Sequence, residues 1–190
     1  LYISESFYKY CTSDKIMNVS SQFLNTKEFR LKAHRYYETY GRHKMQWHTD
    51  TKTSSGFKNI PGLIFICYLT DVFDGEFQYI EGSHKISQSL IINDFNDSQI
   101  ETTFGFNKVK SFTGKKGTLI VYNTAGVHRA KPAIDKNYLR KSLFFQVDAE
   151  DNSEPILINP KFITYLNDNI KYYLGIGRLS DYAEFPKTSI

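Results

Sequence analysis

Short apolar segments recur through the middle of the chain, and turn residues separate them. Residues 29–40 alternate weakly between apolar and polar side chains, and residues 62–71 form an almost continuous apolar run. Alternation is typical of a strand with one buried face, whereas a short apolar run is typical of a strand buried on both faces. The pair Asp74-Gly75 predicts a hairpin turn, with residues 76–81 as the returning strand.

The strand-like pattern continues in the second half of the chain. Residues 86–106 are less regular and predict one short helix, around residues 97–103. Four further strands are predicted at residues 107–113, 117–123, 126–130 and 138–148. About eight short strands with turn signals between them predict a mainly β protein, a jelly roll or another double-sheet fold.

Beyond residue 150 the pattern changes. Pro160 and the apolar residues after it predict a helix with proline in its first turn, and residues 170–190 predict an irregular tail packed outside the core. No repeat or linker divides the chain. We therefore expect a single domain over residues 1–190, with its core at about 29–148 and a C-terminal helix and tail in 150–190. The chain begins at Leu1, so we expect a fragment from which N-terminal elements are missing.

Composition narrows the class of protein. Hydrophobic residues make up 41% and charged residues 23% of the chain, the balance of a globular protein. The net charge is only +4 and no run of Lys or Arg stands out, so we expect no nucleic-acid partner. No stretch reaches the roughly 18 apolar residues of a membrane helix, so we expect no membrane partner. The two cysteines, Cys11 and Cys67, lack metal-type spacing, which favours a reducing compartment and predicts a cytoplasmic protein.

Two histidines and a carboxylate are the candidate metal ligands. His48 and Asp50 are two residues apart, and residues i and i+2 of a strand share a face. His128 follows 80 residues after His48, close to Gly126 at the start of a predicted strand. Two imidazoles and one carboxylate are typical of a non-haem Fe(II) site with open coordination positions. Because a bare His-x-Asp is common by chance, the alternative is that His48 and Asp50 are ordinary surface residues of a strand.

Arg140 and Ser142 are candidates for binding an anion. They share one face of the last predicted strand with Phe144, whereas Phe145 lies on the other face. An arginine inside such an apolar strand needs an anionic partner, and its planar guanidinium suits a carboxylate held by two hydrogen bonds. Ser142 can donate one more. The alternative is an ordinary salt bridge from Arg140 to an internal Asp or Glu.

Together these segments resemble the phytanoyl-CoA dioxygenase-like family of Fe(II)- and 2-oxoglutarate-dependent oxygenases. The resemblance covers roughly residues 40–148. It is carried by Trp47-His48-Thr49-Asp50, by the segment from Tyr68 to Lys85, by His128 and by Arg140 twelve residues later. The family's Pro-Gly-Ser-His-Lys is here Glu81-Gly82-Ser83-His84-Lys85, a change that touches a turn and not a metal ligand.

The resemblance implies a double-stranded β-helix (a cupin-like jelly roll) with a few peripheral helices. It implies His48, Asp50 and His128 as the catalytic iron ligands, and Arg140 and Ser142 as the contacts of 2-oxoglutarate. Fe(II), 2-oxoglutarate and O2 would then serve to hydroxylate an unactivated C–H bond of a small-molecule or acyl-type substrate, with succinate and CO2 as co-products. Asp50 favours hydroxylation over halogenation, because related halogenases carry a small residue at that position.

Two other classes of function stay open at this point. One is a jelly-roll module that binds a small molecule or a sugar and carries a non-catalytic metal site. The other is a cupin-like metalloenzyme that does not use 2-oxoglutarate and so does not need Arg140 facing inward. In each case we expect a small-molecule partner whose identity the residues do not give. Residues 51–61 and 86–106 flank the proposed site and are the expected specificity elements.

Overall fold

The chain forms two compact units in the computed structural model. The structure describes residues 4–41, 45–50, 52–53, 56–57, 61–86, 94–149, 159–162 and 167–176. One unit is Arg35–Phe144, and the other combines Leu1–His34 with Phe145–Ile190. That the 190 residues form a single domain stays a prediction.

The helices are short, and along the chain they lie before, between and after the strands. They are α1 (Glu5–Cys11), α2 (Asp14–Leu24), α3 (Ser83–Ile86), α4 (Asp97–Thr103), α5 (Asp168–Leu174) and the 3₁₀ turns η2 (Phe106–Lys108) and η3 (Pro160–Phe162). None of the helices in the described residues has the length and apolar character that a membrane crossing requires.

Strands make up most of the Arg35–Phe144 unit. They are β1 (Arg30–Tyr40), β2 (Trp47–His48), β3 (Lys52–Thr53), β4 (Gly56–Phe57), β5 (Gly62–Tyr68), β6 (Val72–Ile80), β7 (Asp94–Phe95), β8 (Val109–Gly114), β9 (Leu119–Asn123), β10 (His128–Ala130) and β11 (Leu139–Asp148). β3 and β4 pair in a small ladder of their own, within residues 51–61, one of the two expected specificity elements.

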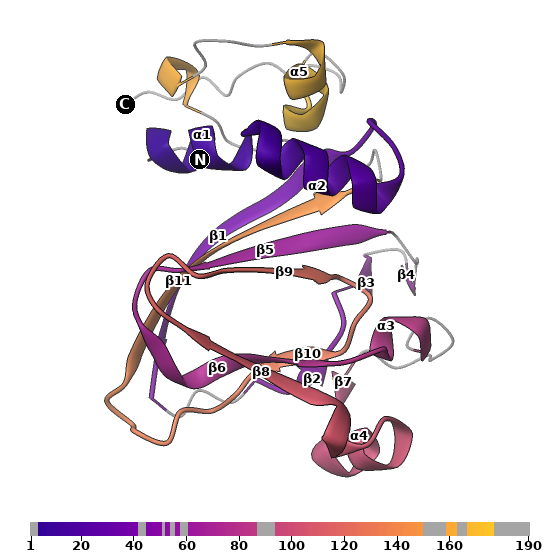
Figure 1. Cartoon of the computed structure of the whole chain (residues 1–190), viewed down its shortest axis with the longest axis vertical. Helices are drawn as coiled ribbons and strands as arrows, with labels where there is room; N and C mark the ends of the chain where they lie inside the picture. Colours follow the sequence, from indigo (N-terminus) through magenta and orange to yellow (C-terminus); the bar gives the residue numbers. More distant parts are fainter. Residues whose placement is uncertain are drawn as a thin grey trace. The chain divides into compact units, whose positions relative to one another are not determined.

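The other strands form two sheets that face each other (Figure 1). Their orders are β1-β11-β5-β9 and β7-β2-β10-β6-β8. The strands pair from the two ends of the chain inward, as in a hairpin folded over on itself. The neighbouring pairs are β1 with β11, β2 with β10, β5 with β9, and β6 with β8. A ribbon of eight strands wrapped into two sheets is a jelly roll, as the strand spacing predicts.

Apolar side chains from both sheets fill the space between them. The buried cluster there consists of Ile64, Ile66, Tyr68, Val72, Phe77, Ile120 and Tyr122, with Tyr79 and Phe144 packed against it. We call this set the interior cluster. It includes residues of β5 and β9 from one sheet and of β6 from the other, so it ties the sheets together through burial of apolar surface.

A second apolar cluster fixes α4 against the outer side of the other sheet. Trp47, Ile80, Phe95, Ile100, Phe104 and Val127 are buried in it. The helix spans Asp97–Thr103, as predicted, because a capping box defines its first turn: Asn96 accepts from Gln99 N, and the Gln99 side chain accepts from Asn96 N. Trp47, on the short strand β2, is thereby buried in the same cluster as Ile100 of α4.

The predicted hairpin at Asp74-Gly75 is wrong. β6 runs unbroken from Val72 to Ile80, and β5 and β6 lie in different sheets. The Asp-Gly pair marks a register shift between Val72 and Phe77 in the ladder with β8, where Gly75 adopts a φ of +60°. A glycine with positive φ suits a β-bulge as well as a hairpin turn, so the dipeptide alone does not distinguish them.

The second unit contains α1, α2 and α5, and the ends of β1 and β11. Phe145 of β11 packs edge to face against Phe7 and Tyr10 of α1, with ring centroids 5.8 and 6.0 Å apart. Burial therefore changes sides along β11: Arg140 and Ser142 are buried on one face, and Phe145 and Val147 on the other. The alternation predicted for this strand is confirmed, and both of its faces are used.

The C-terminal prediction is partly wrong. Only a 3₁₀ turn, Pro160–Phe162, is described where a helix is predicted, and residues 163–166 lie outside the described residues. A helix instead occupies Asp168–Leu174, inside the predicted irregular tail. Asn167 caps its first turn and Gly175, with φ +76°, ends it, which is a regular cap pair.

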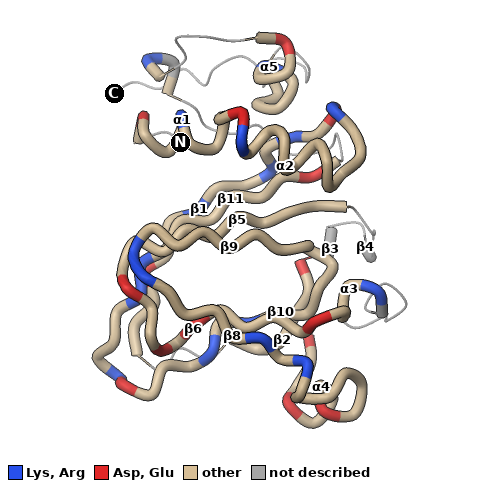
Figure 2. Tube along the Cα trace, viewed as in Figure 1, with Lys and Arg blue, Asp and Glu red and all other residues tan. Residues whose placement is uncertain are grey.

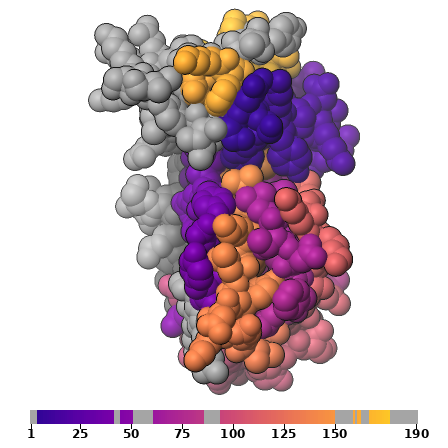
Figure 3. Space-filling view, turned by 90° about the vertical axis from the view of Figure 1, so that its left-hand side faces the viewer, coloured from indigo at the N-terminus to yellow at the C-terminus, as the bar shows by residue number. Residues whose placement is uncertain are grey.

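β1 is an edge strand with a polar exposed side. Figure 3 shows its purple residues beside the orange residues of β11. Tyr36 and Tyr40 both donate hydrogen bonds to Glu38, and Lys141 of β11 pairs with the same carboxylate at 3.0 Å. A charged edge of this kind disfavours pairing with a further strand.

Charged side chains are spread along the described trace. Figure 2 shows Lys and Arg interspersed with Asp and Glu. Several cations pair with acids from distant segments, such as Lys110 with Glu81 at 3.2 Å and Lys115 with Asp71 at 3.0 Å. Such exposed pairs contribute little to stability.

Candidate metal centre and anion site

Two neighbouring strands place the candidate histidines side by side. β2 and β10 are antiparallel, and their register sets His48 directly opposite His128. Directly opposed residues project from the same face of a sheet, and the two imidazole centroids lie 4.3 Å apart. The Asp50 carboxylate joins them, with Oδ2 3.1 Å from His128 Nε2 and Oδ1 3.8 Å from His48 Nε2. One ligand atom of each residue lies within 4.8 Å of the other two.

The backbone orients both imidazoles in the same way. Nδ1 of His48 lies 2.9 Å from the carbonyl oxygen of Gln46, and Nδ1 of His128 lies 2.9 Å from that of Gly126. A carbonyl can only accept, so each Nδ1 carries a proton, and the neutral form of each ring then offers its lone pair at Nε2. Hydrogen bonds of this kind fix the tautomer of metal-binding histidines. Burial, ahead of the nearby His128, lowers the pKa of His48, which favours the neutral form that binds metals.

Asp50 is held by residues of the β9 region, not by a strand ladder. β2 ends at His48, and the amide of Asp50 donates to the carbonyl of Thr124 at 3.0 Å. The Tyr122 hydroxyl donates to Asp50 Oδ2 at 3.1 Å. Burial alone would raise the pKa of the Asp50 carboxyl, but the neighbouring His128 and the hydrogen bonds outweigh it and lower that pKa to about 2. Asp50 is therefore a carboxylate over the whole physiological range.

When both imidazoles are neutral, as metal ligands must be, the acceptors of this cluster outnumber its protons. His128 Nε2 and Asp50 Oδ2 then face each other as two lone-pair atoms at 3.1 Å. The Tyr122 hydroxyl lies 3.1 Å from Oδ2 and 3.3 Å from Nε2, but its single proton can bond well to only one of them. The remaining lone pairs suit a cation. Two imidazole nitrogens and a carboxylate oxygen fit a divalent transition metal such as Fe(II).

Arg140 and Ser142 are buried, with hydrogen-bonding groups unused. Arg140 is 7% exposed and Ser142 0% exposed. The guanidinium donates to the Gly75 carbonyl and, at 3.5 Å, to the Thr39 hydroxyl, whereas Arg140 Nε and Ser142 Oγ have no partner. Burial lowers the pKa of Arg140, which nevertheless stays charged. Buried donors without partners are unusual, and two from adjacent positions on one strand face point to a missing acceptor.

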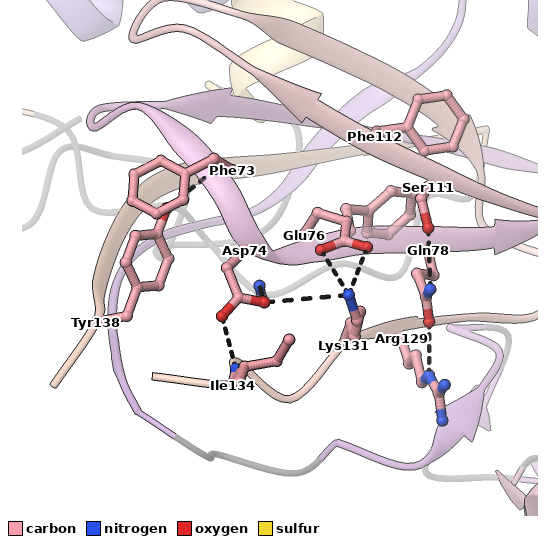
Figure 4. Close-up of polar contacts among 12 residues, drawn as sticks. Phe73, Asp74, Glu76, Gln78, Ser111, Phe112, Arg129, Lys131, Ile134 and Tyr138 are labelled. Carbon is pink, nitrogen blue, oxygen red and sulfur yellow. Dashed lines mark hydrogen bonds and ion pairs between the residues drawn. The ribbon is translucent and has the colours of Figure 1, made fainter. Parts of the chain in front are cut away.

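No carboxylate among the described residues pairs with Arg140. The nearby Glu76 pairs with Lys131, with a nitrogen–oxygen distance of 3.3 Å (Figure 4). The same view shows Arg129 bonded to Gln78 at 2.9 Å. Among the described residues Arg140 thus forms no salt bridge with an Asp or Glu, although the charge of the nearby Glu76 favours the charged form of the guanidinium.

Sequence reasoning missed Tyr122. It lies on β9, is buried, and is the one phenol in the described residues that contacts two members of the His-Asp-His cluster. Burial, and then the charge of Asp50, raise its pKa well above the ordinary value, so it is a proton donor. The apolar run Leu119-Ile120-Val121-Tyr122 contains it, and nothing in that run separates a site residue from a core residue. Of the predicted specificity segments, residues 51, 54–55 and 58–60 of 51–61 and residues 87–93 of 86–106 lie outside the described residues.

Comparison with known proteins gives the fold. No protein-family model and no curated protein matches the sequence. Among solved structures, HygX from Streptomyces hygroscopicus with nickel and 2-oxoglutarate bound matches with a TM-score of 0.57 and 17% identity, covering 76% of this chain and 67% of HygX. EctD from S. alaskensis with bound Fe matches with a TM-score of 0.58 and 18% identity, covering 75% of this chain and 52% of EctD.

A third match is AviO1 from Streptomyces viridochromogenes Tue57, with a TM-score of 0.52 and 15% identity over 76% of this chain and 61% of AviO1. At these identities the likeness establishes the fold. The mainly β jelly roll expected from the strand pattern and from the family resemblance is confirmed.

Proposed function

We propose that this chain is an Fe(II)- and 2-oxoglutarate-dependent dioxygenase that hydroxylates an unactivated C–H bond of a small-molecule or acyl-type substrate. His48, Asp50 and His128 would hold the iron. Arg140 and Ser142 would bind the distal carboxylate of 2-oxoglutarate. When bound, the iron supplies the redox chemistry by which O2 oxidises 2-oxoglutarate to succinate and CO2 and leaves one oxygen atom on the substrate.

One observation carries the proposal: a three-ligand cluster and two unsatisfied buried donors border the same interior cluster. Tyr122, opposite Ile64 on β5, contacts the ligands, whereas Arg140 lies near Tyr68 at the other end of β5. Ile64 and Tyr68 are four residues apart, about 13 Å along a strand. A five-carbon dicarboxylate, with an arginine side chain reaching toward it, can bridge a separation of this size.

Some residues of the site would compensate charge, and others would exclude water. Asp50 offsets part of the charge of a divalent ion, and Arg140 offsets a carboxylate in a place where water does not solvate it. Phe77, a buried residue of the interior cluster, has its ring 5.5 Å from that of His128 and would help to shield that ligand from water. These roles require nothing of the chain beyond binding, orienting and shielding the reacting groups.

The solved neighbours favour a small-molecule substrate. One HygX structure contains nickel, 2-oxoglutarate and hygromycin B, and it matches this chain at 18% identity with a TM-score of 0.56. For this chain we infer from that structure only that the substrate is a small molecule. The identity of the substrate is to be found by screening.

The test is a binding titration followed by turnover. Under anaerobic conditions, Ni(II) as a redox-inert substitute and then 2-oxoglutarate should each bind in a 1:1 ratio. With Fe(II) and O2, the protein should form succinate, and a candidate substrate should raise the rate and gain one oxygen atom, measured by mass spectrometry.

The competing classes give different results. A binding module with a non-catalytic metal would bind Ni(II) and form no succinate, and a cupin-like metalloenzyme would bind Ni(II) without 2-oxoglutarate. Asp50→Ala is the control, because it removes the only carboxylate of the cluster and should abolish succinate formation. Full succinate formation by Asp50→Ala would contradict the proposed ligand set.

A further inference from the structure

Tyr122 contacts the proposed metal ligands and has no part in the function proposed above. Its hydroxyl lies 3.1 Å from Asp50 Oδ2 and 3.3 Å from His128 Nε2. Its ring is fixed by the neighbours in the interior cluster, with centroid distances of 4.7 Å to Phe77 and 6.0 Å to Tyr79. Phenylalanine would fill the same apolar space, so packing does not account for the hydroxyl.

Asp50 needs support that a strand does not give it. His48 and His128 lie in β2 and β10, where the ladder and a carbonyl hydrogen bond orient each of them. Asp50 lies two residues beyond the end of β2. Apart from the two histidines, the described residues give it the Thr124 carbonyl on its amide and the Tyr122 hydroxyl on its side chain. Among the described residues outside the ligand set, Tyr122 alone restrains the carboxylate.

Proton counting shows which acceptor the hydroxyl serves once a metal is bound. The proton faces both Asp50 Oδ2 and His128 Nε2. A metal on His128 uses the only lone pair of Nε2, whereas a carboxylate that binds a metal keeps lone pairs for another partner. The hydroxyl then has one acceptor left, which is Asp50.

We propose that Tyr122 is a positioning residue of the metal centre: its hydroxyl donates to Asp50 and holds the carboxylate in the orientation that binds the metal. This inference rests on the proposed function, because it assumes that Asp50 is a ligand. Hydrogen bonds to a ligating carboxylate restrict its rotation, and their loss typically lowers metal affinity or activity by 10- to 100-fold.

The experiment compares metal binding by wild type, Tyr122→Phe and Tyr68→Phe. Tyr68 is the matched control, because it is a buried phenol of the same interior cluster whose hydroxyl bonds to the backbone of Phe112 and Phe77 and to no metal ligand. Ni(II) affinity is measured by calorimetry, and the ligand geometry by the visible d–d bands of bound Co(II). Far-UV circular dichroism confirms that each variant is folded.

Tyr122→Phe should bind Ni(II) roughly 10- to 100-fold more weakly than wild type and alter the Co(II) bands. Tyr68→Phe should leave both unchanged. Equal Ni(II) affinity and equal Co(II) spectra in wild type and Tyr122→Phe would overturn the positioning role while leaving the metal site intact.

Two other results would also overturn it. If the oxidised, Fe(III)-loaded wild type shows a visible phenolate-to-iron absorption that Tyr122→Phe lacks, Tyr122 is itself a ligand and not a donor to Asp50. If the wild type binds neither Ni(II) nor Co(II), the proposed metal centre fails, and the inference fails with it.

Discussion

Arg140 is the residue that most narrowly limits what the interior can bind. Its guanidinium is buried, and Nε has no hydrogen-bond partner. Ser142, two residues later, is also buried, and its Oγ has no partner either. A planar fork of donors recognises a carboxylate by two parallel hydrogen bonds, which an ammonium group cannot reproduce.

Arg140→Lys should therefore weaken 2-oxoglutarate binding. Losing one charge-assisted hydrogen bond costs on the order of 1.5–3 kcal/mol, which is a factor of roughly 10 to 150 in affinity. Ni(II) affinity should stay the same, because Arg140 carries no ligand atom. Calorimetric titration of the Ni(II)-loaded protein measures the change, and an unaltered affinity for 2-oxoglutarate would assign Arg140 to a structural role.

At the scale of single residues, the spacing of side chains along the sequence helps to find candidate site residues, but the sequence does not predict which hydrogen bonds they form. The spacing of His48 and Asp50 picks out two side chains that the structure brings together with His128, and that of Arg140 and Ser142 picks out two buried side chains with unpartnered atoms. Their roles as ligands and anion contacts stay predictions. Tyr122 could not be found this way, because its role depends on one hydroxyl in an apolar run. Arg129, next to His128, contacts Trp47, Gln78 and Asp97.

At the scale of elements, the short strand β2 depends on α4 for its position. Trp47 of β2 donates its indole N–H to Asp97 at 2.9 Å, and Arg129 of β10 pairs with the same carboxylate at 2.9 Å. The guanidinium of Arg129 also lies 4.1 Å from the centre of the Trp47 ring. One carboxylate at the start of α4 thus joins the two strands that carry the histidines.

Asp97→Ala should destabilise the protein, because the buried indole N–H of Trp47 loses its acceptor. The free energy of unfolding should fall by about 1–3 kcal/mol, measured by urea titration. Asp168→Ala is a matched control: Asp168 also follows an asparagine cap at the start of a helix, but within the described part of the chain it pairs only with the exposed Lys171. It should change stability by less than about 0.5 kcal/mol. Equal effects of the two substitutions would mean that only helix capping is being measured.

Elements were predictable where one local signal governs them. The helix at Asp97–Thr103 and the strands around residues 62–71 and 138–148 follow from capping residues and apolar runs. The Asp74-Gly75 hairpin fails because the same dipeptide serves a bulge. The helix Asp168–Leu174 has a clear cap at Asn167, yet the aromatic residues around it conceal the helical pattern.

At the scale of the whole molecule, strand pairing is the part that the sequence does not reveal. The predicted strands are consecutive along the chain, but β5 and β6, like β8 and β9, lie in different sheets. Pairing of this kind is decided by contacts between distant segments, and no local pattern encodes them. The jelly roll was predictable as a class from strand number and spacing, and the order within each sheet only through the family resemblance.

The opposition of His48 and His128 has a consequence for folding kinetics. The two residues are directly paired although they are 80 positions apart. Contacts this distant in sequence form only after a large loss of chain entropy, and folds that depend on them fold slowly. We therefore predict that the proposed metal ligands converge late, after the rate-limiting barrier.

A metal ion added before refolding should consequently leave the refolding rate unchanged and slow unfolding instead. At a free Ni(II) concentration of about 100 times its dissociation constant, the equilibrium shifts by roughly 100-fold, and nearly all of this should appear in the unfolding rate constant. Stopped-flow fluorescence of Trp47 in urea, with and without Ni(II), measures both rates. Acceleration of refolding by Ni(II) would show that the ligands already meet in the transition state, and that the ribbon closes earlier than the pairing implies.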